Sequence, residues 1–253
     1  MPRKALHTRL EMRASVPLYK QVETQILQCL AEGEWKPGDQ LPTESQLAER
    51  LGVAVFTIRA GIAELVAANI LIRQQGKGTF VARHTRQRQR YQFSHVFGSD
   101  GLQIFPDREL ISFERETAPA PLQAILRLQA QARPAIFNID CLLTTGPQRV
   151  ATMQITLPAK NFAGLTARVI RDSDENLYAV YQDACGVNII RIEERIHATI
   201  ATAGIARALK IPPGSPLLHI ERIAYTYNDV PVEFRVRHLD ATKYHYRSGE
   251  GGF

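Results

Sequence analysis

Apolar residues recur at helical spacing through the first part of the chain. Leu18, Val22, Ile26 and Leu30 follow one another every four residues, which places them on one side of an amphipathic helix. Gly33 comes directly after this run and favours a helix end. The pattern therefore predicts a helix whose apolar side packs against other elements.

Two further helical patterns follow, joined by a tight turn. The segment TESQ has the form of a capping box, in which Thr43 caps a helix over about 44–50, and Gly52 then favours a turn. The next pattern covers 54–68, and its apolar residues share one side of the helix: Ile58, Ile62, Leu65 and Val66. Two helices with so short a connection predict a helix-turn-helix.

Apolar runs on both sides of Gly76-Lys77-Gly78 predict a β-hairpin over 70–82. Glycines at its tip allow the backbone to approach a partner closely. The hairpin is therefore expected to form a wing that presents Gln75 and Lys77 to a nucleic-acid groove.

Beyond residue 110 the pattern changes to strand-like alternation, and it occurs twice. The segments ISFERE (111–116) and RIEERI (191–196) each lead into a helical segment and then into further strands. Each half closes with a hairpin, and Asn228-Asp229 marks the turn of the second; a helix that ends at Gly186 lies between the halves. We expect an α+β domain with an antiparallel sheet covered by helices, and a ligand site in a cleft between the two halves.

Charge separates the same two regions. Residues 1–90 hold 14 Lys and Arg against 8 Asp and Glu, whereas residues 91–253 hold 17 of each kind. All of the excess positive charge therefore lies in the first third, which indicates an anionic polymer or surface as its partner. A basic face without a partner is the alternative interpretation.

The chain offers little for metal or catalytic chemistry. The three cysteines form no CxxC pair, the histidines lack HxxxH or HxH spacing, and no P-loop, dinucleotide fingerprint or Ser-His-Asp order is found. We therefore expect no metal site, cofactor or catalytic residue. The chain also lacks a run of about 18 apolar residues and a secretory signal, so we expect a cytoplasmic protein without a membrane partner.

Residues 17–82 resemble the winged helix-turn-helix domain of GntR-family bacterial transcription regulators. The resembling segments are PLYKQVETQIL, GEWKPGDQLPTESQLAERLGV, TIRAGIAELVAANIL and RQQGKGTFV. The resemblance implies a homodimer that binds a roughly palindromic operator in double-stranded DNA through the second helix, the third helix and the wing. The candidate DNA contacts are Thr43, Ser45, Phe56, Thr57, Arg59, Gln75, Gly76, Lys77 and Gly78, and the resemblance carries over Thr57, Arg59, Gln75 and Lys77 among them.

This chain departs from the family pattern at the front of the third helix. The family has an arginine where this chain has Ser45, and a Ser-Arg pair where it has Ala54-Val55. Only Arg59 of the usual arginine set remains, which argues against readout of guanine by arginine. For Phe56 two interpretations stay open, namely contact with a thymine methyl group or packing against a neighbouring side chain.

Basic segments flank this domain. Residues 1–16 form a basic N-terminal arm, and residues 83–92 form a basic linker with four arginines, Arg83, Arg86, Arg88 and Arg90. The linker is either a solvated connection between domains or a segment that follows DNA phosphates. Residues 248–253 are expected to be a C-terminal tail.

Residues 93–247 resemble the UTRA domain of the HutC subfamily, whose fold resembles that of chorismate lyase. The resembling segments are FERETAPAPL, IPPGSPLLHIERIAY, VPVEF and KYHY. The resemblance implies a domain that binds a small-molecule effector and contributes to dimerisation. The candidate ligand-binding residues are Ser99, Cys141, Leu143, Met153, Arg222, Tyr225, Glu233 and Tyr244.

Three of these candidates change the expected effector. The family's ligand-facing arginines fall at Cys141 and Leu143, and a glutamate of the family falls at Met153. Because two cationic positions are lost, we expect a partly apolar effector that is less anionic than a sugar phosphate. Plain sheet core is the alternative role of these three residues.

The sequence thus predicts a ligand-responsive transcriptional regulator, a repressor that a small metabolite releases from its operator. Two alternatives stay open. One is a degenerate regulator that binds DNA with little sequence preference, and the other is an enzyme domain of the chorismate lyase type fused to a DNA-binding head.

Overall fold

The computed structural model describes residues 15–83, 95–128, 132–173 and 176–247. It divides into two compact units, the first made up mainly of residues up to Arg83 and the second mainly of residues from His84 onward. The N-terminal arm up to residue 14, most of the linker and the tail from residue 248 lie outside the described residues.

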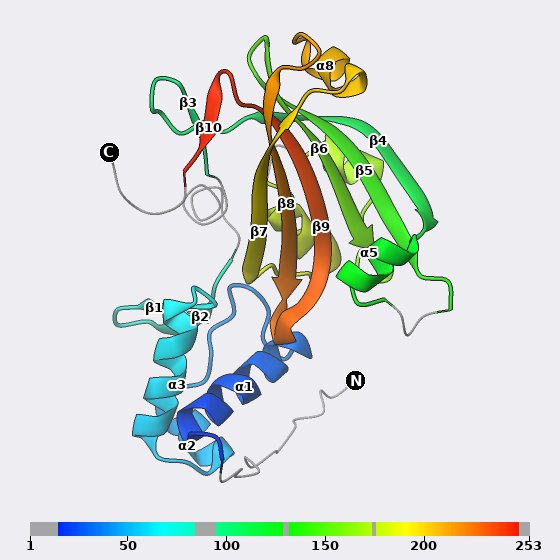
Figure 1. The fold of residues 1–253 in the computed structure, drawn as a ribbon. Helices are drawn as coiled ribbons and strands as arrows, with labels where there is room; N and C mark the ends of the chain where they lie inside the picture. Colours follow the sequence, from blue (N-terminus) through cyan, green and yellow to red (C-terminus); the bar gives the residue numbers. More distant parts are fainter. Residues whose placement is uncertain (1–14, 84–94, 129–131, 174–175, 248–253) are drawn as a thin grey trace. The chain divides into compact units, whose positions relative to one another are not determined.

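The first unit is a three-helix domain with a two-stranded hairpin (Figure 1). Its elements are α1 (Leu18–Ala31), α2 (Glu44–Leu51), α3 (Val55–Ala67), β1 (Leu71–Gln74) and β2 (Gly78–Val81). The expected helix-turn-helix and wing are therefore confirmed. Buried apolar residues from all three helices form the core, and a side chain at Gly61 would meet Val22 of α1 at 2.8 Å. A glycine at this position therefore allows α3 to lie close against α1.

Local signals define the ends of these elements. The Thr43 hydroxyl accepts a hydrogen bond from the Gln46 amide, and the Gln46 side chain accepts one from the Thr43 amide, which confirms the capping box. Gly52 ends α2 in the left-handed conformation, with φ of 69°. Gly76, at the tip of the hairpin, has φ of 72°. Both angles lie in the region that glycine adopts without strain.

The second unit is built on a six-stranded antiparallel sheet with the order β4-β5-β6-β9-β8-β7. The strands are β4 (Asp107–Thr117), β5 (Ala135–Thr145), β6 (Gln148–Pro158), β7 (Arg191–Ile200), β8 (Pro216–Thr226) and β9 (Val230–Asp240). Each edge strand is followed by a short helix, α5 (Ala120–Ile125) or α8 (Ala203–Leu209), and then by a hairpin. The expected repeat is confirmed, and pairing of β6 with β9 joins its two halves.

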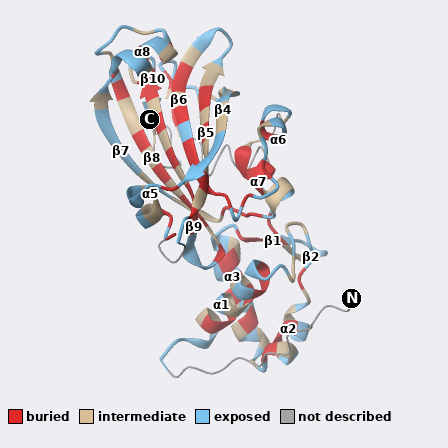
Figure 2. Cartoon of the chain, turned by 90° about the vertical axis from the view of Figure 1, so that its right-hand side faces the viewer, coloured by how far each residue is buried: buried red, intermediate tan, exposed pale blue. Residues whose placement is uncertain are grey.

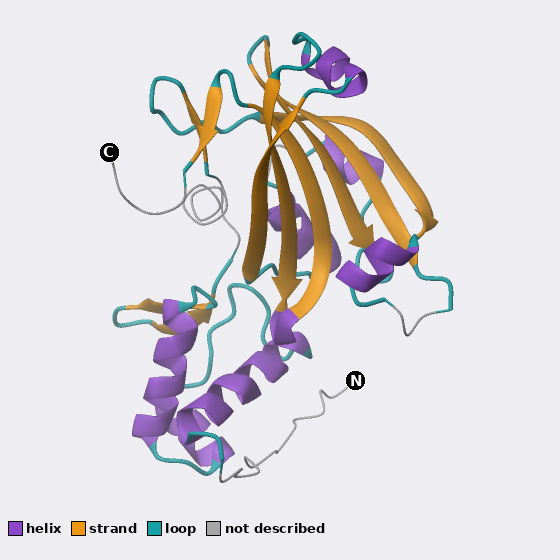
Figure 3. Ribbon diagram, in the orientation of Figure 1, coloured by secondary structure: helices purple, strands orange, loops and turns teal. Residues whose placement is uncertain are grey.

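The two faces of this sheet are covered by different helices (Figures 2 and 3). On the inner face, Ile139 and Ile155 pack against α6 (Ala167–Arg171) and α7 (Leu177–Cys185) in the main core. On the outer face, α5 packs near Ile136 and α8 packs near Leu142. Because strand residues alternate between faces, both faces bury apolar side chains.

A smaller sheet was not expected from the sequence. It pairs β3 (Val96–Gly98) with β10 (Tyr244–Tyr246), and two three-residue strands are too short to show a period of two. Tyr244 packs with Val150 and Leu239 of the large sheet, so the small sheet is anchored by apolar contacts. None of the described helices is long and apolar enough to cross a membrane.

Candidate functional sites

The front of α3 carries an exposed aromatic side chain. Phe56 is 78% exposed, two residues after Ala54 at the start of the helix. An exposed fraction this large does not fit the interpretation that Phe56 packs against a neighbouring side chain among the described residues. Thr57 is half-buried and Arg59 is exposed, so the helix presents an apolar and a cationic group next to each other.

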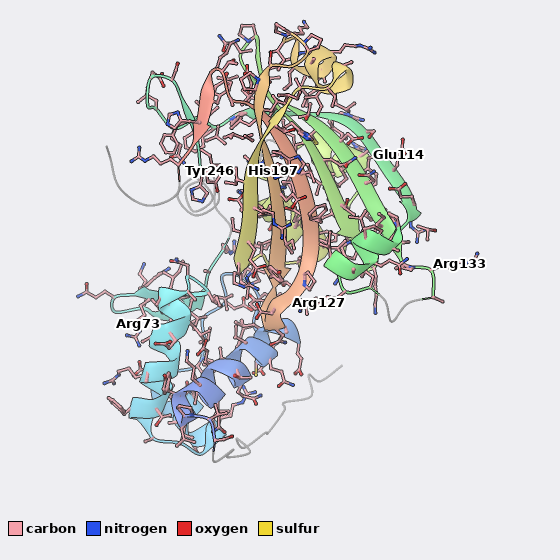
Figure 4. The ribbon with its side chains drawn as sticks, viewed as in Figure 1. Arg73, Glu114, Arg127, Arg133, His197 and Tyr246 are labelled. Carbon is pink, nitrogen blue, oxygen red and sulfur yellow. The ribbon has the colours of Figure 1, made fainter. Side chains whose placement is uncertain are left out.

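A single glutamate connects α2, α3 and the wing. The Glu44 carboxylate accepts a hydrogen bond from Arg59 Nε at 2.9 Å and another from Arg73 Nη2 at 3.2 Å. Glu44 lies in the first turn of α2, Arg59 on α3 and Arg73 on β1 (Figure 4 labels Arg73). Sequence analysis missed Glu44 and Arg73, because the first looks like an ordinary residue of the capping box and the second like a polar residue of a hairpin.

The remaining DNA-binding candidates lie at exposed positions of the same unit. Thr43 and Ser45 are exposed at the start of α2, although the Thr43 hydroxyl also caps this helix. Gln75, Gly76, Lys77 and Gly78 are exposed at the hairpin tip. The Gln40 side chain donates a hydrogen bond of 2.6 Å to the Lys77 carbonyl oxygen, which fixes the wing against the preceding loop.

Charged side chains gather on the inner face of the six-stranded sheet, on β7, β8 and β9. Glu194 lies opposite Arg222, Arg222 lies opposite Arg235, and Ala224 lies opposite Glu233. Arg237 follows two residues after Arg235 on the same face. We call this group the arginine cluster: Glu194, Arg222, Glu233, Arg235 and Arg237. All of its members except the half-buried Glu194 are buried.

Two carboxylates hold the arginines of the cluster. Glu194 Oε1 accepts from Arg222 Nη2 at 2.7 Å and from Arg237 Nη2 at 3.2 Å. Glu233 Oε2 accepts from Arg235 Nη2 at 2.8 Å, and the hydroxyl group of Tyr181 on α7 donates to the same carboxylate at 2.8 Å. Burial opposes ionisation of Glu194, but the charges of Arg222 and Arg237 outweigh this effect and hold the pKa of its carboxyl below the ordinary value.

The cluster holds more positive than negative charge. Its three guanidinium groups face two carboxylates, and Nε of Arg235 and Nε of Arg237 have no hydrogen-bond partner among the residues that the structure describes. Burial, together with the charges of Arg222 and Arg235, lowers the pKa of the Arg237 guanidinium to about 10. Such a site favours an anion, because buried cations without a full set of partners are costly.

Only some of the predicted ligand-binding residues meet at this cluster. Arg222 and Glu233 belong to it, and Met153 lies opposite both Arg237 and Cys141. Leu143 lies two residues after Cys141 on β5, opposite Ala151 of β6 and Arg108 of β4. The main core includes Cys141 and Met153, and Leu143 packs against it. These three residues therefore have at least the structural role that the sequence left open as an alternative.

The other predicted ligand-binding residues make their contacts elsewhere. The Tyr225 hydroxyl donates to Glu193 at 2.7 Å, and the Tyr244 hydroxyl donates to Gln148 at 3.2 Å. Ser99 is exposed in the loop after β3. The structure therefore does not bring these three residues to the arginine cluster.

Sequence analysis missed Glu194, Arg235 and Arg237 as site residues. Glu233, Arg235 and Arg237 alternate along one strand, a pattern that is typical of a solvent-facing side. Instead, Glu233 and Arg235 lie against tyrosines of α7, and Arg237 pairs with Glu194 of β7. The expectation of a less anionic effector rested on two lost arginines of β5. Arg237 of β9 is separated from Cys141 by Met153 of β6, so positive charge lies two strands away from one of these positions, and the expectation stays a prediction.

Comparison with known proteins agrees with both units. Residues 18–81 match the family model described as bacterial regulatory proteins, gntR family, and residues 103–245 match that of the UTRA domain. An HTH-type transcriptional regulator of Mycobacterium tuberculosis is 29% identical over 92% of this chain and 86% of its own length. The mannosyl-D-glycerate transport/metabolism system repressor MngR of Escherichia coli is 30% identical over 83% of this chain and 85% of its own length.

A solved structure gives the same result for the second unit. The ligand-binding domain of a regulator assigned to the GntR family, from Bordetella bronchiseptica, superposes with a TM-score of 0.59 at 30% identity. The alignment covers 64% of this chain and 99% of that domain. The relatives are transcriptional regulators, and none of these comparisons supports the enzyme alternative. The chain therefore belongs to the gntR family of bacterial regulatory proteins and is a DNA-binding transcriptional regulator with a UTRA effector-binding domain.

Proposed function

We propose that this regulator is a homodimeric repressor that leaves its operator when a small anionic effector binds at the arginine cluster. The observation that carries the proposal is the surplus of buried positive charge on the inner face of the sheet. Arg108, a half-buried residue on the same face of β4, adds a further guanidinium, which donates to the Ile170 carbonyl oxygen at 3.1 Å. An anion at this site would compensate charges that two carboxylates leave unbalanced.

The chemistry of the lining favours a carboxylate or phosphate group joined to an apolar part. Guanidinium groups bind both of these anions through paired N–H donors. Met153 lies directly opposite Arg237, and Cys141 lies next to Met153, so an apolar surface adjoins the cations. Burial raises the pKa of the Cys141 thiol to about 11, so this thiol stays neutral and adds no negative charge of its own.

On the DNA side we propose that α2, α3 and the wing of each subunit contact one half-site of the operator in the cytoplasm. Phe56 is placed to touch a thymine methyl group, Arg59 a phosphate, and Lys77 the neighbouring groove. Effector binding then shifts the population towards an arrangement whose two DNA-binding units no longer match the half-site spacing.

Isothermal titration calorimetry tests the effector class. We expect inorganic phosphate, glucose 6-phosphate or phenylacetate to bind the wild-type protein, whereas glucose does not. Arg237→Met should weaken anion binding at least tenfold, and Arg195→Met, which changes an exposed arginine of β7, is the matched control. Binding of glucose as tight as that of the anions, or unchanged anion binding by Arg237→Met, would overturn the proposal.

The weakly specific regulator remains a second candidate, because Glu44 neutralises part of the positive charge of Arg59 and Arg73. A mobility-shift titration against the DNA upstream of the gene and against scrambled DNA, at two salt concentrations, separates the two candidates. A specific repressor prefers the upstream DNA by a factor on the order of 10³ or more. Equal affinities would favour the weakly specific regulator.

A further inference from the structure

The strongest feature beyond the proposed function is a contact between the arginine cluster and the small sheet. The hydroxyl group of Tyr246, the last residue of β10, donates a hydrogen bond to Glu194 Oε2. Figure 4 labels Tyr246. Tyr246 lies opposite Val96 of β3, and the Arg247 amide donates to the His95 carbonyl oxygen at 2.9 Å. Glu194 thus connects two buried arginines to the small sheet.

The two oxygens of Glu194 serve different partners. Oε1 accepts from Arg222 and Arg237, and Oε2 accepts from Tyr246. Burial and the hydrogen bond to Glu194 both raise the pKa of the Tyr246 hydroxyl, so this group remains a donor at neutral pH. Any event that moves the Glu194 carboxylate away from the arginines must therefore alter its contact with β10.

Arg237 is the more weakly held of the two arginines. Its contact with Glu194 is 3.2 Å long, against 2.7 Å for Arg222, and its Nε has no partner among the described residues. A bound anion could accept a hydrogen bond from Arg237 Nε and a second one from Arg237 Nη2, because a carboxylate or phosphate accepts paired hydrogen bonds from one guanidinium. It would then compete with Glu194 for the same N–H donors.

Within the small sheet, β3 is the strand that lies nearer in sequence to the DNA-binding unit. β3 begins at Val96, directly after the segment 84–94 that connects it by sequence to the wing, which ends at Val81. A change in the pairing of β3 with β10 therefore acts on the residues at which the connection enters the second unit.

We propose that Glu194 is an internal counterion that an anionic effector displaces from Arg237, and that Tyr246 transmits the displacement to the small sheet. This inference rests on the proposed function, because the effector that it invokes is the anion proposed above. Without effector, Glu194 holds both arginines and Tyr246. With effector, the anion takes Arg237, and the loss of the Tyr246 contact loosens β10 against the large sheet.

Tyr246→Phe is the direct test, with inorganic phosphate as the probe. The substitution removes one hydroxyl group and leaves the ring in place. Because the hydroxyl stabilises only the effector-free arrangement, its loss should tighten phosphate binding by about tenfold, as expected for a hydrogen bond to a charged group. Tyr244→Phe is the matched control on the same strand, since the Tyr244 hydroxyl contacts Gln148 and not the cluster. It should leave the phosphate affinity within about twofold of the wild type.

Hydrogen exchange supplies a second readout that needs no ligand. Exchange of the β3 and β10 amides should speed up in Tyr246→Phe and in Glu194→Gln. Phosphate should speed up the same amides in the wild type and add nothing in Tyr246→Phe.

The outcomes separate this inference from the proposed function. Unchanged or weaker phosphate binding by Tyr246→Phe, or unchanged exchange of β3 and β10 in both variants, overturns the coupling while anion binding stands. If the wild type binds no anion, the proposed function and the displacement fail together, and faster exchange in the variants would then show a structural contact alone.

Discussion

The two units of this regulator use the same arrangement of one glutamate between two arginines in opposite surroundings. In the first unit, Glu44 pairs with Arg59 and Arg73, whose side chains are 59% and 45% exposed. In the second, Glu194 pairs with Arg222 and Arg237, whose side chains are 1% and 9% exposed. Exposure decides what each arrangement can do, because water and salt screen the first pairs and not the second.

The exposed arrangement suits exchange of partners. A surface ion pair contributes about 0–1 kcal/mol, so a DNA phosphate can replace Glu44 beside Arg59 at little cost. The buried arrangement suits selection, because an ion in that position must supply both charge and hydrogen bonds before it can replace Glu194. The difference in exposure agrees with DNA binding by the first unit and supports the proposal that the second unit recognises a small ion.

The largest difference between the two units is expected in the free energy of unfolding that each loses when its glutamate, Glu194 or Glu44, is replaced by alanine. Glu194→Ala leaves Arg222 and Arg237 buried without their carboxylate and should destabilise the second unit by about 3–5 kcal/mol. Glu44→Ala should cost the first unit less than about 1 kcal/mol. Urea unfolding measures both, because Trp35, the single tryptophan, reports the first unit and far-UV circular dichroism reports mainly the larger second unit. Equal losses in the two variants would refute the contrast.

Val55→Arg tests whether the front of α3 lies in the DNA groove. Val55 is the first residue of α3, one turn before Arg59. An arginine at this position should strengthen binding and change the base preference, with discrimination of about 1–3 kcal/mol for a bidentate contact to guanine. Affinity for a panel of operator variants measures the effect, and Glu49→Gln, which also raises the net charge by one at an exposed position of α2, is a charge-matched control. Identical gains from both substitutions would place the front of α3 away from the bases.

Glu44→Gln should free Arg59 and Arg73 for phosphates while keeping the size of the side chain. We expect DNA binding to tighten several-fold on all sequences alike, and the slope of log K against log salt to steepen by about one. Fluorescence anisotropy at four salt concentrations measures both quantities. If Glu44→Gln instead weakens binding, Glu44 orients Arg59 for the DNA and does not compete with it.

Lowering the pH to about 5.5 should reduce the stability of the second unit alone. This is the smallest of the expected effects. His197, His219 and His238 lie opposite one another on β7, β8 and β9, and their neighbouring ring centroids are 4.4 and 4.7 Å apart. Burial, together with the charges of His219 and His197, lowers the pKa of His238 below 6.5. The unfolded chain therefore binds the proton more readily, so stability is complete above pH 6.5 and is lost as the pH falls below it.

The groups that face this row of histidines are Glu221 on β8, 3.5 Å from His219, and Thr152 on β6, 3.4 Å from His238. Urea unfolding at pH 7.5 and pH 5.5 checks the effect, and residues 15–83 contain no histidine, so the Trp35 signal is an internal control. His238→Gln should reduce the difference between the two pH values. An equal loss in both units would show that another group titrates.

Local signals explain how much could be predicted. The capping box at Thr43, the turn at Gly52 and the four-residue spacing of α1 act within a few residues, so they predict the first unit well. The repeat of strand, helix and hairpin likewise predicts the six-stranded sheet, and Asn228 and Asp229 adopt the positive φ angles, 59° and 53°, of the expected tight turn.

The arginine cluster lay beyond such signals because it depends on contacts distant in the sequence. Arg235 and Arg237 look like the solvent side of a strand, but Arg235 lies against Tyr178 of α7 and Arg237 pairs with Glu194 of β7, both of which are distant in the sequence. Tyr181 lies on the buried side of α7, but its hydroxyl contact with Glu233 could not be inferred from spacing. The pairing of Glu194 with Tyr246 joins residues 52 positions apart, through a sheet too short to leave a pattern.

We expect an anion at the buried cluster to weaken DNA binding at the exposed surface. The most direct measurement is the dissociation constant for the DNA upstream of the gene, with and without inorganic phosphate or phenylacetate, at constant ionic strength. We predict that at least one of these anions weakens DNA binding by about fivefold or more in the wild type and in Arg195→Met, and not in Arg237→Met. An equal effect of the anions on Arg237→Met, or no effect on the wild type despite measured anion binding, would contradict the account.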